Sequence, residues 1–392
     1  MKIIKWIGVS LALLFVISTV GFFGFVPAIA EKGMNTVEPH APYQISTSAR
    51  ALHDSLVIAD LHADSTLWNR DLLKRSDYGH VDIPRMVAGN QAIQVFTTVT
   101  KTPAGLNYNH NSAEARDNIT LLAVGQLWPI RTWNSLTERA LYQASRLHKM
   151  EAKAPQQFKV IETQQDLRDL LTARANGSEI VGGLIGTEGS HALDGELSNI
   201  DRLYDAGFRM MSLHHFFDNK LGGSLHGASQ AGLTDFGKAV VRKLDSMPVV
   251  LDLSHSSEAV VEQALVMVTH PVVISHTGTH GHCESPRNIA DSLMQKIAAQ
   301  GGVVGIGYWD AVCDISPQGI ASAIAAAVEL LGEDHVGLGS DFDGSVHTAL
   351  DSSELAAITQ TLMARGFSAD VIRKVMGGNV VRVFGERLPT EN

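Results

Sequence analysis

Residues 249–276 read VVLDLSHSSEAVVEQALVMVTHPVVISH and combine two short apolar runs with one amphipathic segment. The runs, Val249–Leu253 and Val272–Ile274, are continuous rather than alternating, as in strands that are buried on both faces of a parallel sheet. Between them, residues 256–268 carry apolar side chains at three- and four-residue spacing, which favours a helix. This strand–helix–strand pattern predicts an α/β fold with a parallel sheet.

The same alternation continues along the 392-residue chain. The other apolar runs are Leu56–Asp60, Ala92–Val99, Val181–Ile185, Arg209–Leu213, Val303–Ile306 and Val336–Leu338, and further helical patterns cover 196–206, 232–246, 289–300, 317–332 and 351–365. Eight such units predict a (β/α)8 TIM-type barrel, which typically needs roughly 250 residues and tolerates insertions. We expect the main insertion at residues 107–176, as two or three added helices.

The N-terminus has the composition of an export segment. Residues 1–30 contain Lys2 and Lys5 but no acid, and Ala28-Ile29-Ala30 resembles a signal-peptide cleavage site. The uncharged stretch also approaches the roughly 20 residues that cross a bilayer, so an uncleaved anchor through residues 6–26 is the alternative. Either way, we expect the rest of the chain in the periplasm or another extracytoplasmic space. The expected organisation is signal or anchor 1–30, linker 31–48 and barrel domain 49–392.

Composition excludes several classes of protein. The hydrophobic fraction is 45%, against 18% charged residues, which excludes intrinsic disorder. The net charge is −10 with no run of Lys or Arg, which argues against a nucleic-acid partner. Two cysteines, Cys283 and Cys313, are too few for a disulfide scaffold, and without a Cys-x-x-Cys pair a thiolate zinc site is excluded. Whether these two pair depends on geometry.

Polar residues collect at the carboxyl ends of six expected strands, and in this barrel those ends share the mouth where active sites lie. The stretches are Asp60-Leu61-His62-Ala63-Asp64, Gly186-Thr187-Glu188-Gly189, His214-His215, Asp252-Leu253-Ser254-His255, Ser275-His276 and Ser340-Asp341-Phe342-Asp343. Imidazole and carboxylate without thiolate suit zinc, manganese, cobalt or iron. The sequence therefore predicts a metal site at the mouth.

The spacing of these residues favours two ions rather than one. His62 and Asp64 are two residues apart and point to one side of an extended strand, so they form a chelating pair. His255 and His276 end neighbouring strands and can hold a second ion, while Glu188 can bridge the two. Two such metals can activate a shared water and polarise a carbonyl.

These motifs resemble the membrane (renal) dipeptidase family, which are zinc-dependent barrel peptidases. The matching stretches also include His80-Val81-Asp82-Ile83-Pro84-Arg85, Leu213-His214-His215, Arg287-Asn288 and Gly339-Ser340-Asp341-Phe342-Asp343-Gly344, and all of them occur in family order between about residues 50 and 345. The chain departs from the family pattern at 216–223 and 308–314, beside the expected substrate pocket.

The resemblance implies a binuclear zinc dipeptidase that uses a metal-bridging hydroxide. It assigns His62 and Asp64 to one Zn²⁺, His255 and His276 to the other, and Glu188 to the bridge between them. Its further roles are His215 on the substrate carbonyl oxygen, Asp341 as the group that passes a proton to the leaving amine, and Arg287 on the substrate's C-terminal carboxylate, which a guanidinium can bind with two hydrogen bonds. It also implies tolerance of a C-terminal D-residue and a homodimer.

Other interpretations of single residues stay open. Asp341 could cap the following helix, Arg287 could form a surface ion pair, and either His214 or His215 could be the one at the site. We expect a structural role for Asp343, and for Asp60 and Asp252 a role in orienting imidazoles or satisfying backbone groups. His191, His226, His280 and His282 are expected in loops or behind the site.

Three other functions compete with the dipeptidase. One is another metallohydrolase on the same barrel, acting on an amide, lactone or phosphoester; such barrels often bridge their metals with a modified lysine, and no lysine stands at an expected strand end. The second is a non-catalytic envelope binding protein derived from an enzyme. Loss of a metal ligand would indicate this function, and none of the expected ligands is missing. The third is a purely structural envelope protein, which would have no use for a polar mouth.

Overall fold

Eight parallel strands close into a barrel, as the sequence predicts. The computed structural model describes residues 2–391, except the side chains of residues 2–5, 8, 9 and 12. The strands are hydrogen-bonded in the order β3-β2-β10-β9-β8-β7-β6-β5, and β5 pairs back onto β3. They span β2 (Ile58–Ala63), β3 (Gln91–Val99), β5 (Val181–Glu188), β6 (Phe208–Ser212), β7 (Val250–Asp252), β8 (Val273–Thr277), β9 (Val303–Ile306) and β10 (Val336–Leu338).

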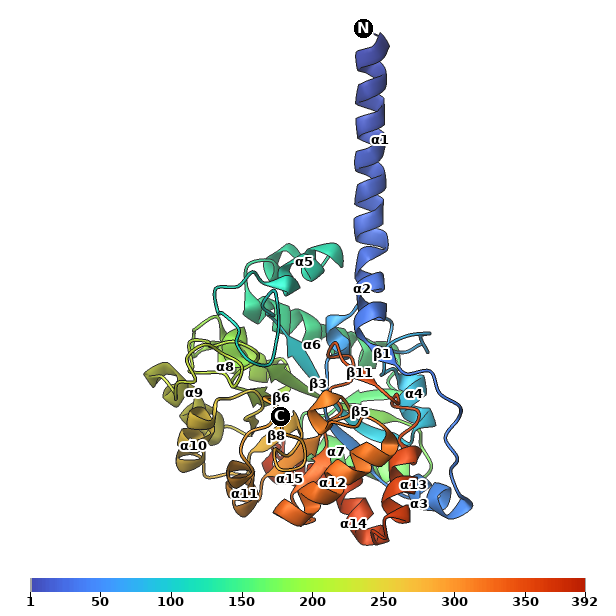
Figure 1. The fold of residues 1–392 in the computed structure, drawn as a ribbon, viewed down its shortest axis with the longest axis vertical. Helices are drawn as coiled ribbons and strands as arrows, with labels where there is room; N and C mark the ends of the chain where they lie inside the picture. The colour runs from blue at the N-terminus through green and yellow to red at the C-terminus, as the bar shows by residue number, and fades with distance from the viewer. Residues whose placement is uncertain (1, 392) are drawn as a thin grey trace.

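Helices surround this barrel (Figure 1). All six expected helices form, with ends that differ from the expected ones by up to five residues. The helices are α1 (Lys2–Gly24), α2 (Val26–Met34), α3 (Thr47–Asp54), α4 (Ile83–Ala88), α5 (Asn118–Gly125), α6 (Leu136–Lys153), α7 (Gln164–Ala175), α8 (Asn199–Asp205), α9 (Asp235–Ser246), α10 (Glu258–Met267), α11 (Asp291–Ala299), α12 (Pro317–Leu331), α13 (Ala356–Ala364), α14 (Ala369–Arg373) and α15 (Asn379–Arg387). Short turns η1 (Ser65–Leu67), η2 (Ile130–Thr132), η3 (Ser190–Leu193), η4 (Asp310–Val312) and η5 (Lys374–Gly378) join them.

The insertion between β3 and β5 contains the expected helices α5, α6 and α7. It also contains a strand that the sequence pattern does not predict, β4 (Phe158–Val160), which pairs in parallel with the outer edge of β5. Three residues are too few for an alternating pattern to stand out between two helices.

One apolar cluster fills the amino end of the barrel. It combines the first residues of three strands, Val250, Val273 and Val303, with Val380 and Phe384 from α15. A larger cluster packs the outer faces of the strands against the surrounding helices. The amino end is therefore plugged by α15, which leaves the carboxyl ends of the strands to form the polar mouth.

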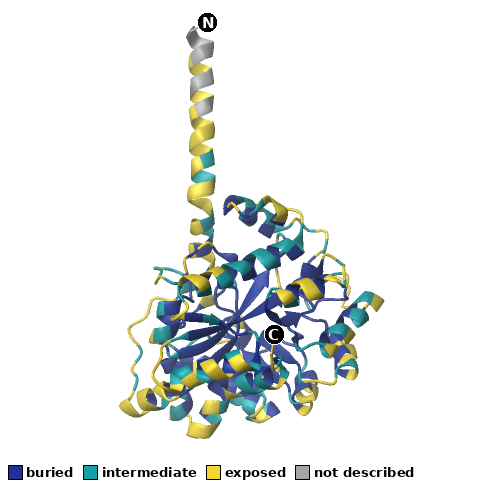
Figure 2. Ribbon diagram, turned by 180° about the vertical axis from the view of Figure 1, so that it is seen from behind, coloured by how far each residue is buried: buried dark blue, intermediate teal, exposed yellow. Residues whose placement is uncertain are grey.

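The N-terminal helix α1 projects from the body, and the side chains described along its first 20 residues are almost all exposed (Figure 2). Among the described residues, one segment, Leu13–Met34, has the length and composition of a membrane span, with a mean hydropathy of 2.2. After α1 the chain returns to the barrel. Residues of the expected linker make contact there: Glu31 is buried, and β1 (Thr36–Val37) pairs with β11 (His347–Thr348).

A disulfide joins Cys283 to Cys313, with 5.6 Å between the two Cα atoms. The sequence left this pairing open. Cys283 lies in the loop after β8 and Cys313 in the loop after β9, so the bond ties together two neighbouring loops at the carboxyl end of the barrel.

A buried ion cluster fixes the loop after β10. Arg70 donates from Nη2 to Asp343 Oδ2 at 2.5 Å and from Nε to Glu31 Oε1, while His80 donates its backbone N–H to Asp343 Oδ1 at 2.7 Å. Burial alone would raise the pKa of Asp343, but Arg70 and the hydrogen bonds from His80 and Ser65 outweigh it and hold the pKa well below its usual range. Burial raises the pKa of Glu31 to about 7 despite Arg70. The structural role expected for Asp343 agrees with these contacts.

Replacing Asp343 by Asn should destabilise the domain by about 3–5 kcal/mol, because it leaves the buried Arg70 charge without one of its partners. Urea unfolding at pH 7 measures this loss. The pKa of Asp343 is lowered on folding, so its contribution is complete above the unfolded pKa and disappears as the pH falls. The gap between wild type and D343N should therefore narrow only below about pH 4. The matched control is D370N, because Asp370 forms an exposed pair with Arg373 and should change stability by less than about 1 kcal/mol. Equal losses in the two variants would contradict the assignment.

Candidate functional site

Seven polar side chains converge at the carboxyl ends of the strands, and each of the seven residues is at most 9% exposed. His62 and Glu188 lie within β2 and β5, and His276 lies within β8. The others follow β2, β6, β7 and β10, and they are Asp64, His215, His255 and Asp341. The structure thus brings together residues that the sequence places at six different strand ends.

The Glu188 carboxylate lies at the centre of this set. Its Oε1 atom is 3.5 Å from Nε2 of His62, 3.4 Å from Nε2 of His215, 3.2 Å from Nε2 of His255 and 3.6 Å from Nε2 of His276. The Nε2 atoms of His255 and His276 are themselves 3.0 Å apart. Four imidazoles therefore direct the same ring nitrogen toward one carboxylate oxygen.

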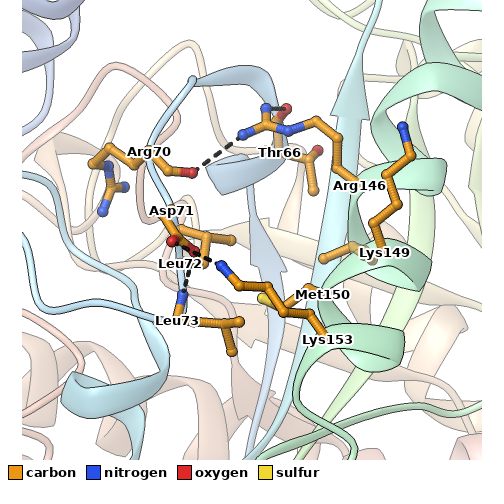
Figure 3. A pocket seen from close by; sticks show the side chains of 10 residues that line it. Thr66, Arg70, Asp71, Leu72, Leu73, Arg146, Lys149, Met150 and Lys153 are labelled. Carbon is orange, nitrogen blue, oxygen red and sulfur yellow. Dashed lines mark hydrogen bonds and ion pairs between the residues drawn. The ribbon is translucent and has the colours of Figure 1, made fainter.

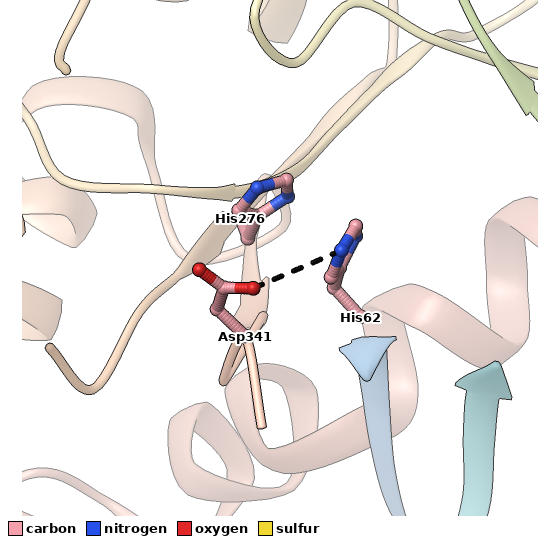
Figure 4. Close-up of side chains that lie close together, drawn as sticks. All are labelled: His62, His276 and Asp341. Carbon is pink, nitrogen blue, oxygen red and sulfur yellow. Dashed lines mark ion pairs between the residues drawn. The ribbon is translucent and has the colours of Figure 1, made fainter. Parts of the chain in front are cut away.

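Three groups of these side chains could each hold a metal ion, because their donor atoms lie within 4.8 Å of one another. Two groups share Glu188, which is the arrangement that a bridging ligand needs. The third combines His62, His276 and Asp341, with 3.9 Å between His62 Nε2 and Asp341 Oδ1 (Figure 4). The groups are His62/Asp64/Glu188, Glu188/His215/His255 and His62/His276/Asp341.

The electrostatics of the set fit a bound cation. Burial, together with the carboxylates of Asp64 and Asp341, raises the pKa of Glu188 well above its usual range. Burial and Asp64 also raise the pKa of Asp341 to about 8, although His62 opposes this. Burial and the Arg287 guanidinium lower the pKa of His255, so its imidazole is neutral. Burial opposes protonation of His62, but the carboxylates of Asp64 and Asp341 outweigh it and raise the pKa of His62. A divalent cation stabilises crowded carboxylates of this kind, because its charge reverses their repulsion.

One serine orients two of the imidazoles. Ser275 Oγ donates to Asp252 Oδ2 at 2.6 Å and so uses its only hydrogen. The same oxygen lies 3.0 Å from His62 Nδ1 and 2.9 Å from His276 Nδ1, so it can accept from both rings. Both Nδ1 atoms then carry hydrogens, and both Nε2 lone pairs face the site, as ligation requires. Asp252 therefore acts on the imidazoles through Ser275.

Asp60 and Thr97 support the site from neighbouring strands. Asp60 accepts from the backbone N–H groups of His62 and Ser340 at 3.0 and 2.9 Å, so it satisfies backbone donors rather than orienting an imidazole. Thr97 donates to Asp64 Oδ1 at 2.6 Å. Thr97 is not predictable from the sequence, since a threonine inside an apolar strand carries no distinctive signal.

Two site residues have a left-handed backbone. His255 has φ 59° and Asp341 has φ 57°, a region that residues other than glycine adopt rarely. Such conformations persist only where the surroundings enforce them, and they concentrate at functional sites.

Of the remaining candidate residues, some lie at the site and others lie behind it or in a loop. Arg287 is buried rather than a surface ion pair, and its Nη2 donates to His276 O at 2.8 Å and lies 3.3 Å from His255 Nε2. His215 faces Glu188, whereas its neighbour His214 contacts Ser256 Oγ through Nδ1. His191 and His226 lie behind the site: the His191 ring is 4.9 Å from Phe217, and the His226 ring is 5.3 Å from His255. His280 and His282 are exposed in a loop.

A cavity of about 580 Å³ extends from the polar set. Glu188, His215, Arg287 and Asp341 line one end, and the opposite wall consists mainly of apolar side chains from α2 and α5. The two segments that depart from the family pattern contribute Phe216 and Trp309, whereas Tyr308 is fully buried outside the lining. The cavity is large enough for a small-molecule substrate.

A second hollow, of about 210 Å³, lies beside α6 and is rich in cationic residues (Figure 3). Three of its four cations already have partners: Arg70 pairs with Asp343, Arg146 donates to Thr66 O and Arg70 O, and Lys153 lies 3.2 Å from Asp71 Oδ2. The polar mouth is therefore the better candidate site.

Replacing Ser275 by Ala should weaken metal binding about 10- to 100-fold, because neither His62 nor His276 would keep its acceptor. Competition with a chromophoric chelator measures this affinity. Ser246, an exposed serine that donates to Lys243 O, gives the control variant S246A, which should bind metal like the wild type. An unchanged affinity in S275A would show that the serine does not set the tautomers.

Known proteins resemble this chain in sequence and in fold. A model of the membrane dipeptidase family, peptidase family M19, matches residues 46–391. Dipeptidase aclJ of Aspergillus oryzae is 33% identical over 221 residues, which are 53% of this chain and 51% of aclJ. The chain spans about half the length of the curated relatives that it matches.

Solved structures show the same fold. The probable dipeptidase PvdM from Pseudomonas aeruginosa superposes with a TM-score of 0.72 at 19% identity, over 87% of this chain and 98% of PvdM. A metallopeptidase from Rhodobacter sphaeroides, solved with a phosphinate mimic of the dipeptide L-Ala-D-Ala, superposes with a TM-score of 0.68 at 24% identity, over 85% and 99% of the two chains. By its family match, and with the polar mouth where the family motifs place it, this chain belongs to the membrane dipeptidase family, peptidase family M19.

Proposed function

We propose that this protein is a binuclear zinc dipeptidase that hydrolyses the peptide bond of dipeptides. The observation that carries the proposal is the Glu188 carboxylate, which four imidazole Nε2 atoms surround at 3.2–3.6 Å. His62 and Asp64 would hold one Zn²⁺, His255 and His276 the other, and Glu188 would bridge them. Two such ions supply an activated water and polarise the scissile carbonyl.

Asp341 is suited to move the proton of the reaction. A carboxyl group can both accept and release a proton, and Asp341 Oδ1 lies 3.9 Å from Nε2 of His62, beside the expected metal ligands. The carboxylate lines the cavity beside His62, and the left-handed backbone at this residue holds it there. We assign it the transfer of a proton from the attacking water to the leaving amine.

His215 is suited to contact the substrate carbonyl oxygen. Burial lowers its pKa to about 4, so its ring is neutral at physiological pH. Its Nε2 atom faces the site, 3.4 Å from Glu188 Oε1. This role requires the tautomer with the hydrogen on Nε2 rather than on Nδ1, which lies 3.4 Å from Lys101 O. A hydrogen-bond donor aimed at the developing oxyanion has a large effect in a water-poor site.

Arg287 is suited to hold the free carboxylate at the C-terminus of the substrate. Its guanidinium lines the cavity, and its hydrogen bonds within the described part of the chain, to His276 O and His255 Nε2, both use Nη2. A guanidinium has five N–H donors, so a carboxylate can still be bound through two of them. The Rhodobacter sphaeroides protein was solved with a mimic of L-Ala-D-Ala, which supports acceptance of a C-terminal D-residue here.

We further infer that the protein is exported and keeps α1 as a membrane anchor. The bond between Ala30 and Glu31, where a signal peptidase would cut, lies inside α2, and the Glu31 side chain is buried against Arg70. The family resemblance also implies a homodimer. This stays a prediction, and light scattering can test it by measuring the molar mass in solution.

Hydrolysis of a panel of L,L- and L,D-dipeptides tests the reaction. We expect cleavage that a chelator abolishes and that added Zn²⁺ restores, with about two Zn²⁺ per chain by elemental analysis. No cleavage by protein carrying two metals would favour the alternative, which is another amide, lactone or phosphoester hydrolase on the same barrel. Failure to bind metal at all would favour a non-catalytic binding protein.

Replacing Arg287 by Met should lower kcat/KM for dipeptides about 10- to 100-fold, since a charge-assisted hydrogen bond contributes about 1.5–3 kcal/mol. Dipeptide amides lack the carboxylate, and their kcat/KM should change little. The control is R373M, because Arg373 pairs only with exposed Asp370, and this variant should match the wild type. Equal losses for dipeptides and their amides would assign Arg287 to the structure of the site; metal content shows whether the site is intact.

A further inference from the structure

Exposed large hydrophobic side chains concentrate in one part of the barrel domain. Among the described residues after α2 there are seven of them, and four lie within a stretch of 13 residues. These four form what we term the α5–η2 face: Leu121 (50% exposed), Leu127 (69%), Ile130 (75%) and Trp133 (36%). The other three, Val57, Leu106 and Val266, lie elsewhere in the sequence. A cluster of this kind marks an interaction surface, whereas single exposed apolar residues need no explanation.

The local backbone holds these side chains outward. Leu127 has φ 56°, which is rare for a residue other than glycine. The turn directs the next residue inward, so Trp128 is only 2% exposed and its ring lies 4.9 Å from Tyr142. Trp128 is buried while the adjacent Leu127 is exposed. The turn therefore makes the outward position of Leu127 a feature of the fold.

The α5–η2 face adjoins the base of α1. Leu127 shares a small hollow with Phe23, Gly24 and Ala28, from the junction of α1 and α2. Leu121 and Val26 line the same cavity wall. Figures 1 and 2 both show α5 beside the base of α1, at the end of the body from which α1 projects.

The length of α1 sets the position of a bilayer. The uncharged run extends from Trp6 to Ala30, and its part before α2, Trp6–Phe25, is about 30 Å of helix, which matches a hydrocarbon core. The apolar segment Leu13–Met34 overlaps this part and continues into α2. The helix α2 cannot continue into lipid, because its Glu31 pairs with Arg70 of the barrel domain. The outer surface of the membrane therefore falls near Phe25, beside Leu127.

We propose that the α5–η2 face inserts into the outer surface of the bilayer that α1 spans. Leucine, isoleucine and tryptophan are the residues that enter the boundary between headgroups and acyl chains. Arg131 lies between Ile130 and Trp133; its Nε donates to Glu138 at 2.9 Å, but its side chain is 55% exposed and its remaining N–H groups can meet lipid phosphates. This second contact would hold the barrel against the membrane, with the apolar cavity wall of α2 and α5 beside the lipid. The inference rests on the proposed anchor and not on the proposed reaction.

Spin labels on the full chain in phosphatidylcholine–phosphatidylglycerol vesicles test the contact. Cys283 and Cys313 are joined, so L127C and I130C each add the one free thiol among the described residues. Both substitutions are on exposed side chains and should leave the fold unchanged. Oxygen, which dissolves in lipid, and a water-soluble nickel chelate serve as collision partners for the label.

We expect labels at 127 and 130 to collide readily with oxygen and to lose most of their collisions with the nickel chelate. The matched control is V266C on α10, where the label should stay in water, because Val266 is 88% exposed. The positive control is F15C on α1, since Phe15 is 73% exposed and falls within the proposed span.

Labels at 127 and 130 that behave like V266C, with F15C in lipid, would overturn the contact and leave the anchor standing. An F15C label in water would overturn both. Labels at 127 and 130 that are protected from oxygen and nickel alike would assign the face to a second copy of the chain and overturn the membrane contact.

Discussion

Seven residue pairs between β3 and β5, from Ile93–Gly182 to Val99–Glu188, close the sheet into a barrel. The site depends on this pairing, because its side chains come from strands around the whole circumference. The pairing brings Glu188 next to the strand of Thr97, which donates to Asp64. A side chain at Gly183 of β5 would collide with the ring of Phe158 from β4 and press on the ring of Phe96 from β3, so the glycine makes room for both rings.

Closure of the barrel buries several carboxylates close together, which costs free energy unless their oxygens are hydrogen-bonded or bind cations. The other residues of the mouth supply such partners. Hydrogen bonds from Thr97, Ser275 and Ser340 satisfy oxygens of Asp64, Asp252 and Asp60, respectively. The oxygens and ring nitrogens that face the site are available to bind cations. When no cation is bound, burial and the neighbouring carboxylates raise the pKa values of Glu188 and Asp341. Behind Asp341, the ion pair between Arg70 and Asp343 fixes the loop. A buried pair is costly to form and costlier to break, so it holds the geometry of that loop.

The N-terminal segment contacts residues that form or support the mouth of the barrel. Glu31 joins the ion cluster that holds the loop of Asp341, and α2 forms part of the cavity wall. The disulfide between Cys283 and Cys313 ties two loops at the same end of the barrel, and disulfides persist outside the cytoplasm. Both features fix segments of the chain at the end of the barrel where the mouth lies, next to the α1 helix that we propose as an anchor.

The sequence by itself determined the eight strands, because strands buried on both faces need continuous apolar runs and these are visible locally. It also determined which strand ends are polar, and so the members of the site from His62 to Asp341. Only the tertiary structure decided the contacts between distant residues: Ser275 beside His62, 213 residues apart, and Arg70 beside Asp343, 273 residues apart. The tertiary structure also decided three further features: the cysteine pairing, the short strand β4 and the α5–η2 face. Periodicity records which face of an element is buried, whereas the partner across that face depends on how the closed barrel packs.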